Sequence, residues 1–143
     1  GIEQVRHFGI TPRVALLSHS NFGSSNAPSA RKMRQASEIL RAKLPDVEID
    51  GEMHSLPALD SAYRETIYGD SQLRGKANLL VVPGLDAANI ALGLLRQTAN
   101  GLLIGPYMSG LKRPAHIMVN SATPRAIYNV SALAVAEILA KQE

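Results

Sequence analysis

The stretch GKANLLVVPGLDAANIALGLLRQTANGLLIGPYMSGLKRP, residues 75–114, carries the pattern that decides the fold. Its first apolar run, Leu79 to Val82, is uninterrupted, which is typical of a strand buried on both faces in a parallel sheet. After Pro83-Gly84, apolar residues recur at helical spacing from Asp86 onward, and a second apolar run, Leu102 to Ile104, follows. Strand, helix and strand in this order form a βαβ unit, so the sequence predicts an α/β fold with a mostly parallel sheet.

The loop after the second predicted strand, residues 107–113, is the first place to look for function. Ligands of open α/β sheets bind at the loops that follow the carboxyl ends of strands. This loop combines an aromatic residue, Tyr107, with a flexible glycine, Gly110, and two cations, Lys112 and Arg113. The alternative is an ordinary surface loop with a structural glycine.

Length and composition place the chain among single α/β domains with an aliphatic core. It has 143 residues with two Phe, four Tyr and no Trp, and without cysteine it forms no disulfide. The net charge of +3 is typical of ordinary surface solvation or of a partner that bears phosphate groups. The cations are scattered without interleaved aromatic residues, which disfavours nucleic acid as a partner.

The same composition disfavours a membrane and indicates a cytoplasmic protein. No apolar run approaches the roughly 20 residues of a membrane span. The chain starts Gly1-Ile2-Glu3-Gln4-Val5-Arg6, which resembles no signal peptide and lacks an initiating methionine. We therefore expect a piece of a longer chain, with residues 2–8 as the end of a helix.

The N-terminal part predicts a strand, a polar loop and a helix. The strand is Arg13 to Leu17, the loop spans residues 18–26, and Asn26 is the expected N-cap of a helix with Pro28 in its first turn. Such a Gly/Ser loop could hold a phosphate on free backbone N–H groups. It matches neither phosphate-binding fingerprint, so an ordinary connection is the stronger interpretation.

The next segment contains acids and a histidine that could indicate metal binding or general-base chemistry. A strand is predicted from Val47 to Asp50, followed by Gly51-Glu52-Met53-His54 and then by Asp60. This spacing matches no zinc-binding pattern, which favours solvated loop residues. Residues 56–67 are predicted to form a helix, and residues 69–75 a loop.

The C-terminal part predicts a last strand, Ala115 to Val119, and a long helix. Thr123-Pro124 is a strong helix start, because threonine caps and proline fits the first helical position. From Ile127 through Leu139 the helix is apolar on most of its surface. We expect it to be covered on more than one side, by a larger domain or by another subunit.

Many short motifs along the chain resemble, in register, those of the phosphate acetyltransferase (phosphotransacetylase) family. They are Leu17-Ser18-His19-Ser20, Asp50-Gly51-Glu52, Gly75-Lys76-Ala77-Asn78, Pro83, Asn89-Ile90, Ile104-Gly105-Pro106, Gly110-Leu111 and Lys112 to Pro114. The resemblance implies a three-layer α/β/α domain of the isocitrate/isopropylmalate dehydrogenase-like architecture, which usually dimerises. Residues 1–143 would form its C-terminal half, with residues 1–11 ending a helix and residues 12–143 forming the α/β subdomain and C-terminal helix.

The departures from this family concern its chemistry. Where family members carry a Ser-Arg-Gly triplet at the CoA and phosphate site, this chain has Val119-Asn120-Ser121, and Ala126 stands at the position of an aspartate. An asparagine cannot supply the charged bidentate contact of a guanidinium, and a methyl group cannot act as a base. An active transferase would need substitutes, for which His116 and Arg125 are the nearby candidates.

A related group, the large bacterial NADP-dependent malic enzymes, departs in the same way. The shared segments are Asp50 to His54, Ala77 to Val81 with Pro83, and Ala132 to Val135 with Glu137. This resemblance implies a catalytically silent regulatory domain that senses acetyl-CoA and forms a homo-oligomer. The malic enzyme catalytic domain, with NADP and a divalent metal, would lie elsewhere in the same chain, and this piece would hold no cofactor. A pure dimerisation module that has lost its ligand is a further alternative.

A binding site for acetyl-CoA needs a cation for its phosphates, close backbone approach, and an apolar surface for its flexible arm. The loop from Tyr107 to Lys112 offers all three, and the turn at residues 120–121 would adjoin it. If this loop is not the site, the loop from Ser18 to Ser25 is the alternative. The residues predicted to bind the ligand are Tyr107, Met108, Ser109, Gly110, Lys112, Asn120, Ser121, Ser20 and Asn21, with no catalytic residue and no metal ligand.

Overall fold

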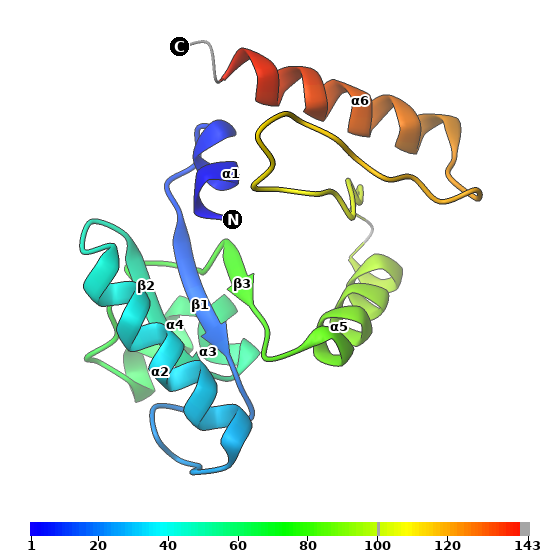
Figure 1. Cartoon of the computed structure of the whole chain (residues 1–143). Helices are drawn as coiled ribbons and strands as arrows, with labels where there is room; N and C mark the ends of the chain where they lie inside the picture. Colours follow the sequence, from blue (N-terminus) through cyan, green and yellow to red (C-terminus); the bar gives the residue numbers. More distant parts are fainter. Residues whose placement is uncertain (100, 141–143) are drawn as a thin grey trace. The chain divides into compact units, whose positions relative to one another are not determined.

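A computed structural model describes residues 1–99 and 101–140, which divide into two compact units (Figure 1). The larger unit spans residues 2–93, and the smaller one comprises residue 1 and the residues from 94 onward. The boundary falls within helix α5, Leu85–Thr98. In the part of the chain that the structure describes, no helix is both long enough and apolar enough to cross a membrane.

A three-stranded parallel sheet forms the centre of the larger unit, as the apolar runs predict. The strands are β1 Arg13–Leu17, β2 Glu48–Met53 and β3 Leu79–Val81, in the order β2-β1-β3. The central strand β1 pairs with both neighbours, and its three middle residues are buried. The α/β class with a parallel sheet is therefore confirmed.

Apolar clusters lie on the two faces of this sheet, each covered by helices (Figure 1). On one face, Val14, Leu16 and Ile49 pack with Met33 of α2, Pro28–Lys43. On the other, Ala15 and Met53 pack with Ala58 of α3, Ser55–Leu59, which adjoins α4, Ser61–Ile67. This layering is the physical reason for apolar side chains at successive positions of β1, since both faces of a central strand are covered.

Strand β2 extends beyond the predicted end at Asp50 and includes Gly51, Glu52 and Met53. Gly51 has φ +131°, and a Cβ there would lie 2.6 Å from the Leu16 carbonyl oxygen. Only glycine fits this close approach, which coincides with the register shift between Leu16 and Leu17. The Asp-Gly-Glu segment therefore belongs to the sheet and not to a loop.

The helices follow their predicted positions with two corrections at their ends. Helix α1 spans Ile2–His7. Asn26 does not cap α2, because the N-cap residue is Ala27 and makes no side-chain cap hydrogen bond. The single helix predicted over residues 56–67 is instead α3 and α4, because Asp60 is extended and caps α4, accepting from the Tyr63 N–H at 3.0 Å.

Strand β3 ends one residue before Val82, and its side chains are half-buried where full burial was predicted. Leu79 and Val81 still pack on one core cluster and Leu80 on the other. The difference arises because β3 is an edge strand among the residues that the structure describes.

The strands predicted at Leu102 to Ile104 and Ala115 to Val119 are wrong, since neither segment has strand structure. A strand needs a neighbouring backbone for its hydrogen bonds, and the described residues supply none to these runs. The crossover helix α5 is confirmed, but the βαβ unit predicted around it is not complete. Large apolar side chains remain exposed there: Leu102, Leu103, Ile104, Ile117 and Val119.

Helix α6, Pro124–Leu139, dominates the smaller unit, and its predicted start is confirmed. The Thr123 side chain caps the helix, accepting from the Ala126 N–H at 3.2 Å. One face is buried (Val130, Leu133 and Glu137), while apolar side chains on another are exposed (Tyr128, Val135, Ile138 and Leu139). Leu133, within the apolar stretch that was expected to be covered by a larger domain or another subunit, is already buried within the chain.

Candidate functional site

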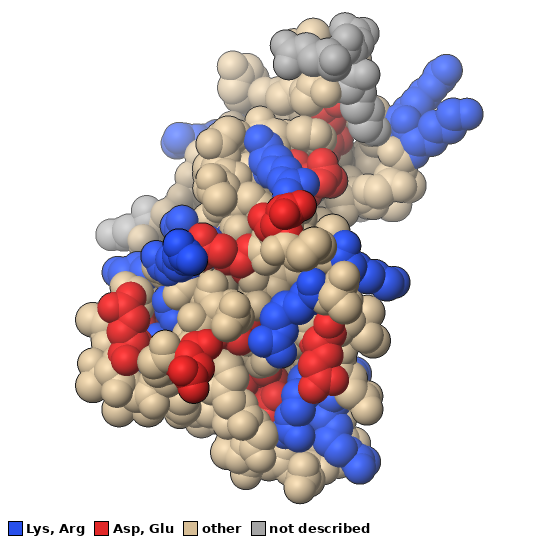
Figure 2. Space-filling view, turned by 90° about the vertical axis from the view of Figure 1, so that its left-hand side faces the viewer, with Lys and Arg blue, Asp and Glu red and all other residues tan. Residues whose placement is uncertain are grey.

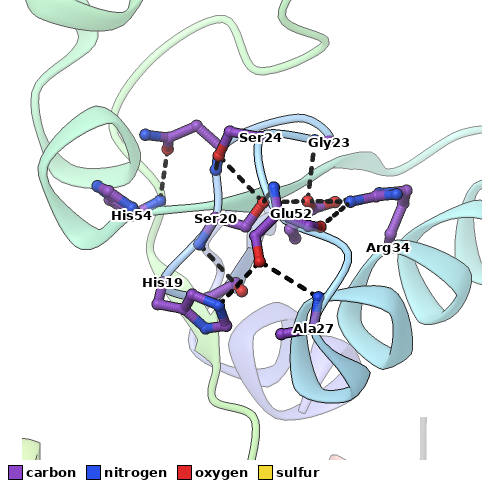
Figure 3. A network of polar contacts seen from close by, with 11 residues as sticks. His19, Ser20, Gly23, Ser24, Ala27, Arg34, Glu52 and His54 are labelled. Atoms are coloured by element: carbon purple, nitrogen blue, oxygen red, sulfur yellow. Dashed lines mark hydrogen bonds and ion pairs between the residues drawn. The ribbon is translucent and has the colours of Figure 1, made fainter.

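A polar network joins the loop after β1, the end of β2 and helix α2 in the larger unit (Figure 3). Its centre is the Glu52 side chain, which is 0% exposed. Arg34 donates to both carboxylate oxygens, from Nε to Oε2 at 3.0 Å and from Nη2 to Oε1 at 2.9 Å. The Ser20 hydroxyl and the Gly23 N–H also donate to Oε1, at 2.8 and 2.9 Å.

These contacts keep Glu52 ionised in a buried position. Burial by itself opposes the charge, but the hydrogen bonds from Arg34, Gly23 and Ser20 outweigh it and lower the pKa of Glu52 to about 2. The same ion pair raises the pKa of Arg34, chiefly through its hydrogen bond to Glu52. The prediction that Asp50 and Glu52 are solvated loop residues is therefore wrong, since both are buried.

The backbone N–H groups of the loop after β1 are largely satisfied within the chain. Ser18 and Phe22 donate to the backbone of β2, and Gly23 donates to the Glu52 carboxylate. Serine side chains accept from the N–H groups of Ser20, Asn21, Ser25 and Ala27. A phosphate bound at this loop would therefore compete with the Glu52 carboxylate for the Gly23 N–H.

A second buried acid, Asp50, fixes the segment before β3. Its Oδ2 accepts from the Ser71 hydroxyl at 2.7 Å and from the Gln72 N–H at 2.8 Å. Arg41 Nη1 lies 3.7 Å from Oδ1. The Oδ1 atom also accepts from the Gly51 N–H at 2.9 Å, so both carboxylate oxygens make contacts within the larger unit.

Of the predicted ligand residues, two lie in the larger unit. Ser20 is fully buried with its hydroxyl in the Glu52 network, and Asn21 is half-buried, with Oδ1 accepting from the His54 N–H at 2.7 Å. His54 and Asp60 are exposed. The residues described by the structure contain no group of three or more His, Asp or Glu side chains that could hold a metal ion.

The other predicted ligand residues lie in the smaller unit, in irregular backbone before α6. Gly110 has φ +80°, a conformation that favours glycine, and Tyr107 is half-buried. The remaining predicted side chains of this unit are exposed to solvent: Met108, Ser109, Lys112, Asn120 and Ser121. The loop therefore presents a cation and small polar groups at its surface.

A buried polar cluster in the smaller unit was not predicted from the sequence. His116 and Glu137 have side chains only 5% and 9% exposed, and Nε2 of the histidine lies 3.7 Å from Oε2 of the glutamate. The Tyr107 ring meets the His116 ring edge-on, with centroids 5.9 Å apart. One signal was available: Glu137 is an acid within the apolar run of the last helix.

Acid should destabilise the protein through Glu52. Because the pKa of this carboxyl falls from 4.5 to about 2 on folding, its contribution is fully present above pH 4.5 and is lost as the pH falls towards 2. A shift of this size corresponds to about 3 kcal/mol. Urea unfolding at pH 7, 4 and 2.5 measures it, and equal loss in wild type and Glu52→Gln would contradict the assignment.

Charged side chains on the face drawn in Figure 2 alternate in sign, with basic and acidic groups side by side. This agrees with the scattered distribution of lysine and arginine along the sequence. A continuous basic stripe is typical of proteins that bind nucleic acid, and this face does not show one.

Comparison with known proteins identifies relatives along nearly the whole chain. Residues 1–135 match the family described as phosphate acetyl/butaryl transferase. The NAD-dependent malic enzyme of Rhizobium meliloti (strain 1021) is 51% identical over 134 residues, covering 94% of this chain and 17% of that protein. The NADP-dependent malic enzyme of Escherichia coli (strain K12) is 52% identical over 136 residues, covering 94% of this chain and 18% of that protein.

A solved structure is similar in fold as well as sequence. The phosphotransacetylase from Streptococcus pyogenes superposes with a TM-score of 0.89 at 30% identity, covering 96% of this chain and 42% of that one. The chain thus spans less than a fifth of the two malic enzymes and less than half of the phosphotransacetylase.

Proposed function

Since this chain belongs to the phosphate acetyl/butaryl transferase family, we propose that it is a catalytically silent member that binds acetyl-CoA and regulates a malic enzyme. The 51% and 52% identities to malic enzymes, against 30% to a phosphotransacetylase, support placing it in such a protein. The malate-oxidising domain would then lie in the remainder of the same chain.

The turn before α6 is the observation that carries this proposal. It presents Val119, Asn120 and Ser121 at the positions of the family's Ser-Arg-Gly triplet, and Ala126 in the first turn of the helix at the position of its aspartate. A methyl group accepts no proton and a neutral amide carries no charge for a phosphate. Loss of the base and of electrostatic stabilisation leaves a fold that can bind the substrate without converting it.

The proposed absence of transferase activity is tested by an assay of acetyl phosphate formation from acetyl-CoA and phosphate. We expect no rate above background. The alternative, an active transferase, relies on His116 and Arg125 as substitutes. Arg125 is exposed on α6 and His116 is buried against Glu137, an arrangement that favours a structural role for the histidine. Turnover that disappears in His116→Ala would support the alternative.

The ligand surface we propose is the loop from Tyr107 to Lys112 with the turn at Asn120-Ser121. Replacing Lys112 by alanine should weaken acetyl-CoA binding by about 1–3 kcal/mol, the range for a hydrogen bond to a charged group. Because Lys112 is exposed, the melting temperature of the free protein should stay unchanged. Calorimetric titration measures the affinity, with exposed Lys43→Ala as the control; equal affinity of both variants would move the site elsewhere.

Oligomerisation is proposed through the exposed apolar side chains of α6. Val135 is 56% exposed, and an aspartate there would place an unpaired charge in the interface. We expect Val135→Asp to shift wild-type dimers or larger oligomers towards monomer in sedimentation velocity at micromolar concentration. Ile39→Asp, at a 54% exposed position on α2, is the matched control. A monomeric wild type would contradict the proposal.

The nicotinamide cofactor and the divalent metal would belong to the remainder of the parent protein. No glycine-rich dinucleotide fingerprint follows a strand of this chain. The two malic enzymes bear NAD-dependent and NADP-dependent names, so either cofactor fits the proposal. We propose a cytoplasmic location, in keeping with an enzyme that acts on a soluble metabolite.

A further inference from the structure

The cluster formed by Tyr107, His116 and Glu137 joins the proposed ligand loop to helix α6. All three residues belong to the smaller unit. Glu137 lies in the last turns of α6, while Tyr107 and His116 stand near the two ends of the irregular segment that contains Gly110 and Lys112. The cluster is therefore placed where it can fix that segment on the helix.

The side chains of His116 and Glu137 lie close together in this cluster, but most of their polar atoms have no hydrogen-bond partner. His116 Nε2 and Glu137 Oε2 are 3.7 Å apart, which is within ion-pair range. Both ring nitrogens of His116, and Oε1 of Glu137, are buried without a hydrogen-bond partner. Unpaired buried polar groups are costly, so the close approach of His116 to Glu137 is the contact in this cluster that can offset part of that cost when the imidazole carries a proton.

Tyr107 connects this pair to the ligand surface. Its ring packs edge-on against His116. Burial, and secondly the negative charge of Glu137, raise the pKa of the Tyr107 hydroxyl. Among the charged side chains that the structure describes in this unit, Glu137 is the one placed beside both His116 and Tyr107. The cations Lys112, Arg113 and Arg125 are exposed to solvent.

We propose that Glu137 and His116 are positioning residues that hold Tyr107 and its loop in the conformation that receives acetyl-CoA. Neither residue needs to touch the ligand. This inference rests on the proposed function and adds a mechanism to it: the helix fixes the loop through a buried His–Glu contact, so the loop does not have to be ordered by the ligand alone.

The first test uses Glu137→Gln, which keeps the size of the side chain and removes its charge. We expect acetyl-CoA to bind about tenfold more weakly in a calorimetric titration, because the ligand would then have to order a loop that the helix no longer holds. Glu137→Asp, which keeps the charge, should recover part of the affinity. Exposed Glu65→Gln should bind like wild type.

A second readout needs no ligand. Spectrophotometric titration of the tyrosines should show one phenol that ionises at lower pH in Glu137→Gln than in wild type, because the negative charge that opposes its ionisation is gone. In a Tyr107→Phe background this difference should vanish. If Glu137→Gln does not fold, His116→Asn provides the second variant, with the same expected loss of affinity.

The outcomes separate this inference from the proposed function. If wild type does not bind acetyl-CoA, the proposed function fails, and so does the positioning role for that ligand, while a shifted tyrosine titration still supports the contact between α6 and the loop. If wild type binds and the Glu137 and His116 variants bind equally well, the positioning role is overturned and the proposed function stands.

Discussion

Replacing Glu52 with glutamine is expected to lower the free energy of unfolding by about 3–5 kcal/mol, the usual cost of removing one partner of a buried ion pair. The amide keeps the shape of the side chain, but it cannot accept from Arg34, Ser20 and Gly23 as a carboxylate does. Arg34 would then lose its counterion, and the loop after β1 would lose its central acceptor.

Chemical unfolding at pH 7 measures this cost, with exposed Glu65→Gln as the matched control, expected to change stability by less than about 0.5 kcal/mol. The double variant Arg34→Met, Glu52→Gln should be less destabilised than the sum of the single variants, because no unpaired charge remains. A Glu52→Gln protein as stable as wild type would show that the network contributes little to folding.

Replacing Arg64 with methionine is the second change with a large expected effect. This side chain is 0% exposed and its guanidinium donates to three backbone carbonyls, those of Pro57 at 2.7 Å, Leu73 at 3.1 Å and Gly75 at 2.6 Å. Methionine fills a similar space without donors. Since each buried acceptor left unpaired costs about 1–3 kcal/mol, we expect a loss of several kcal/mol.

Arg64→Lys sharpens the test, because it keeps the charge but lacks the planar fork that reaches several carbonyls at once. We expect it to be nearly as unstable as Arg64→Met, whereas exposed Arg31→Met should resemble wild type. If lysine restored full stability, charge alone would explain the role of Arg64, and the three-carbonyl geometry would be incidental.

The sequence predicted the elements whose pattern is local. Helices α2, α5 and α6 keep helical spacing over several turns, and β1 and β3 are short apolar runs, so their positions follow from periodicity. The family resemblance, carried by many short motifs in register, is confirmed by the match over residues 1–135 and by the TM-score of 0.89. Several short motifs in the same order and spacing as in a family identify its fold more reliably than any single motif does.

The buried polar networks could not be predicted, because their partners are distant in sequence. In the sequence alone, Asp50 and Glu52 are typical of a solvated loop. The fold brings Ser71 beside Asp50 and Arg34 beside Glu52, and these contacts allow both carboxylates to be buried. Arg64 has carbonyl acceptors, which any residue carries and no sequence pattern marks. The strands expected at residues 102–104 and 115–119 fail for a related reason, since a strand requires a neighbouring backbone as well as an apolar run.

The central claim, binding of acetyl-CoA without chemistry, is tested most directly by calorimetric titration of acetyl-CoA into the chain in phosphate buffer. Binding alone gives a saturable heat that ends after each injection. Turnover gives a continuing heat that lasts until the substrate is consumed. We predict a saturable isotherm with no continuing heat; an absence of binding heat, or a sustained heat with accumulation of acetyl phosphate, would contradict the account.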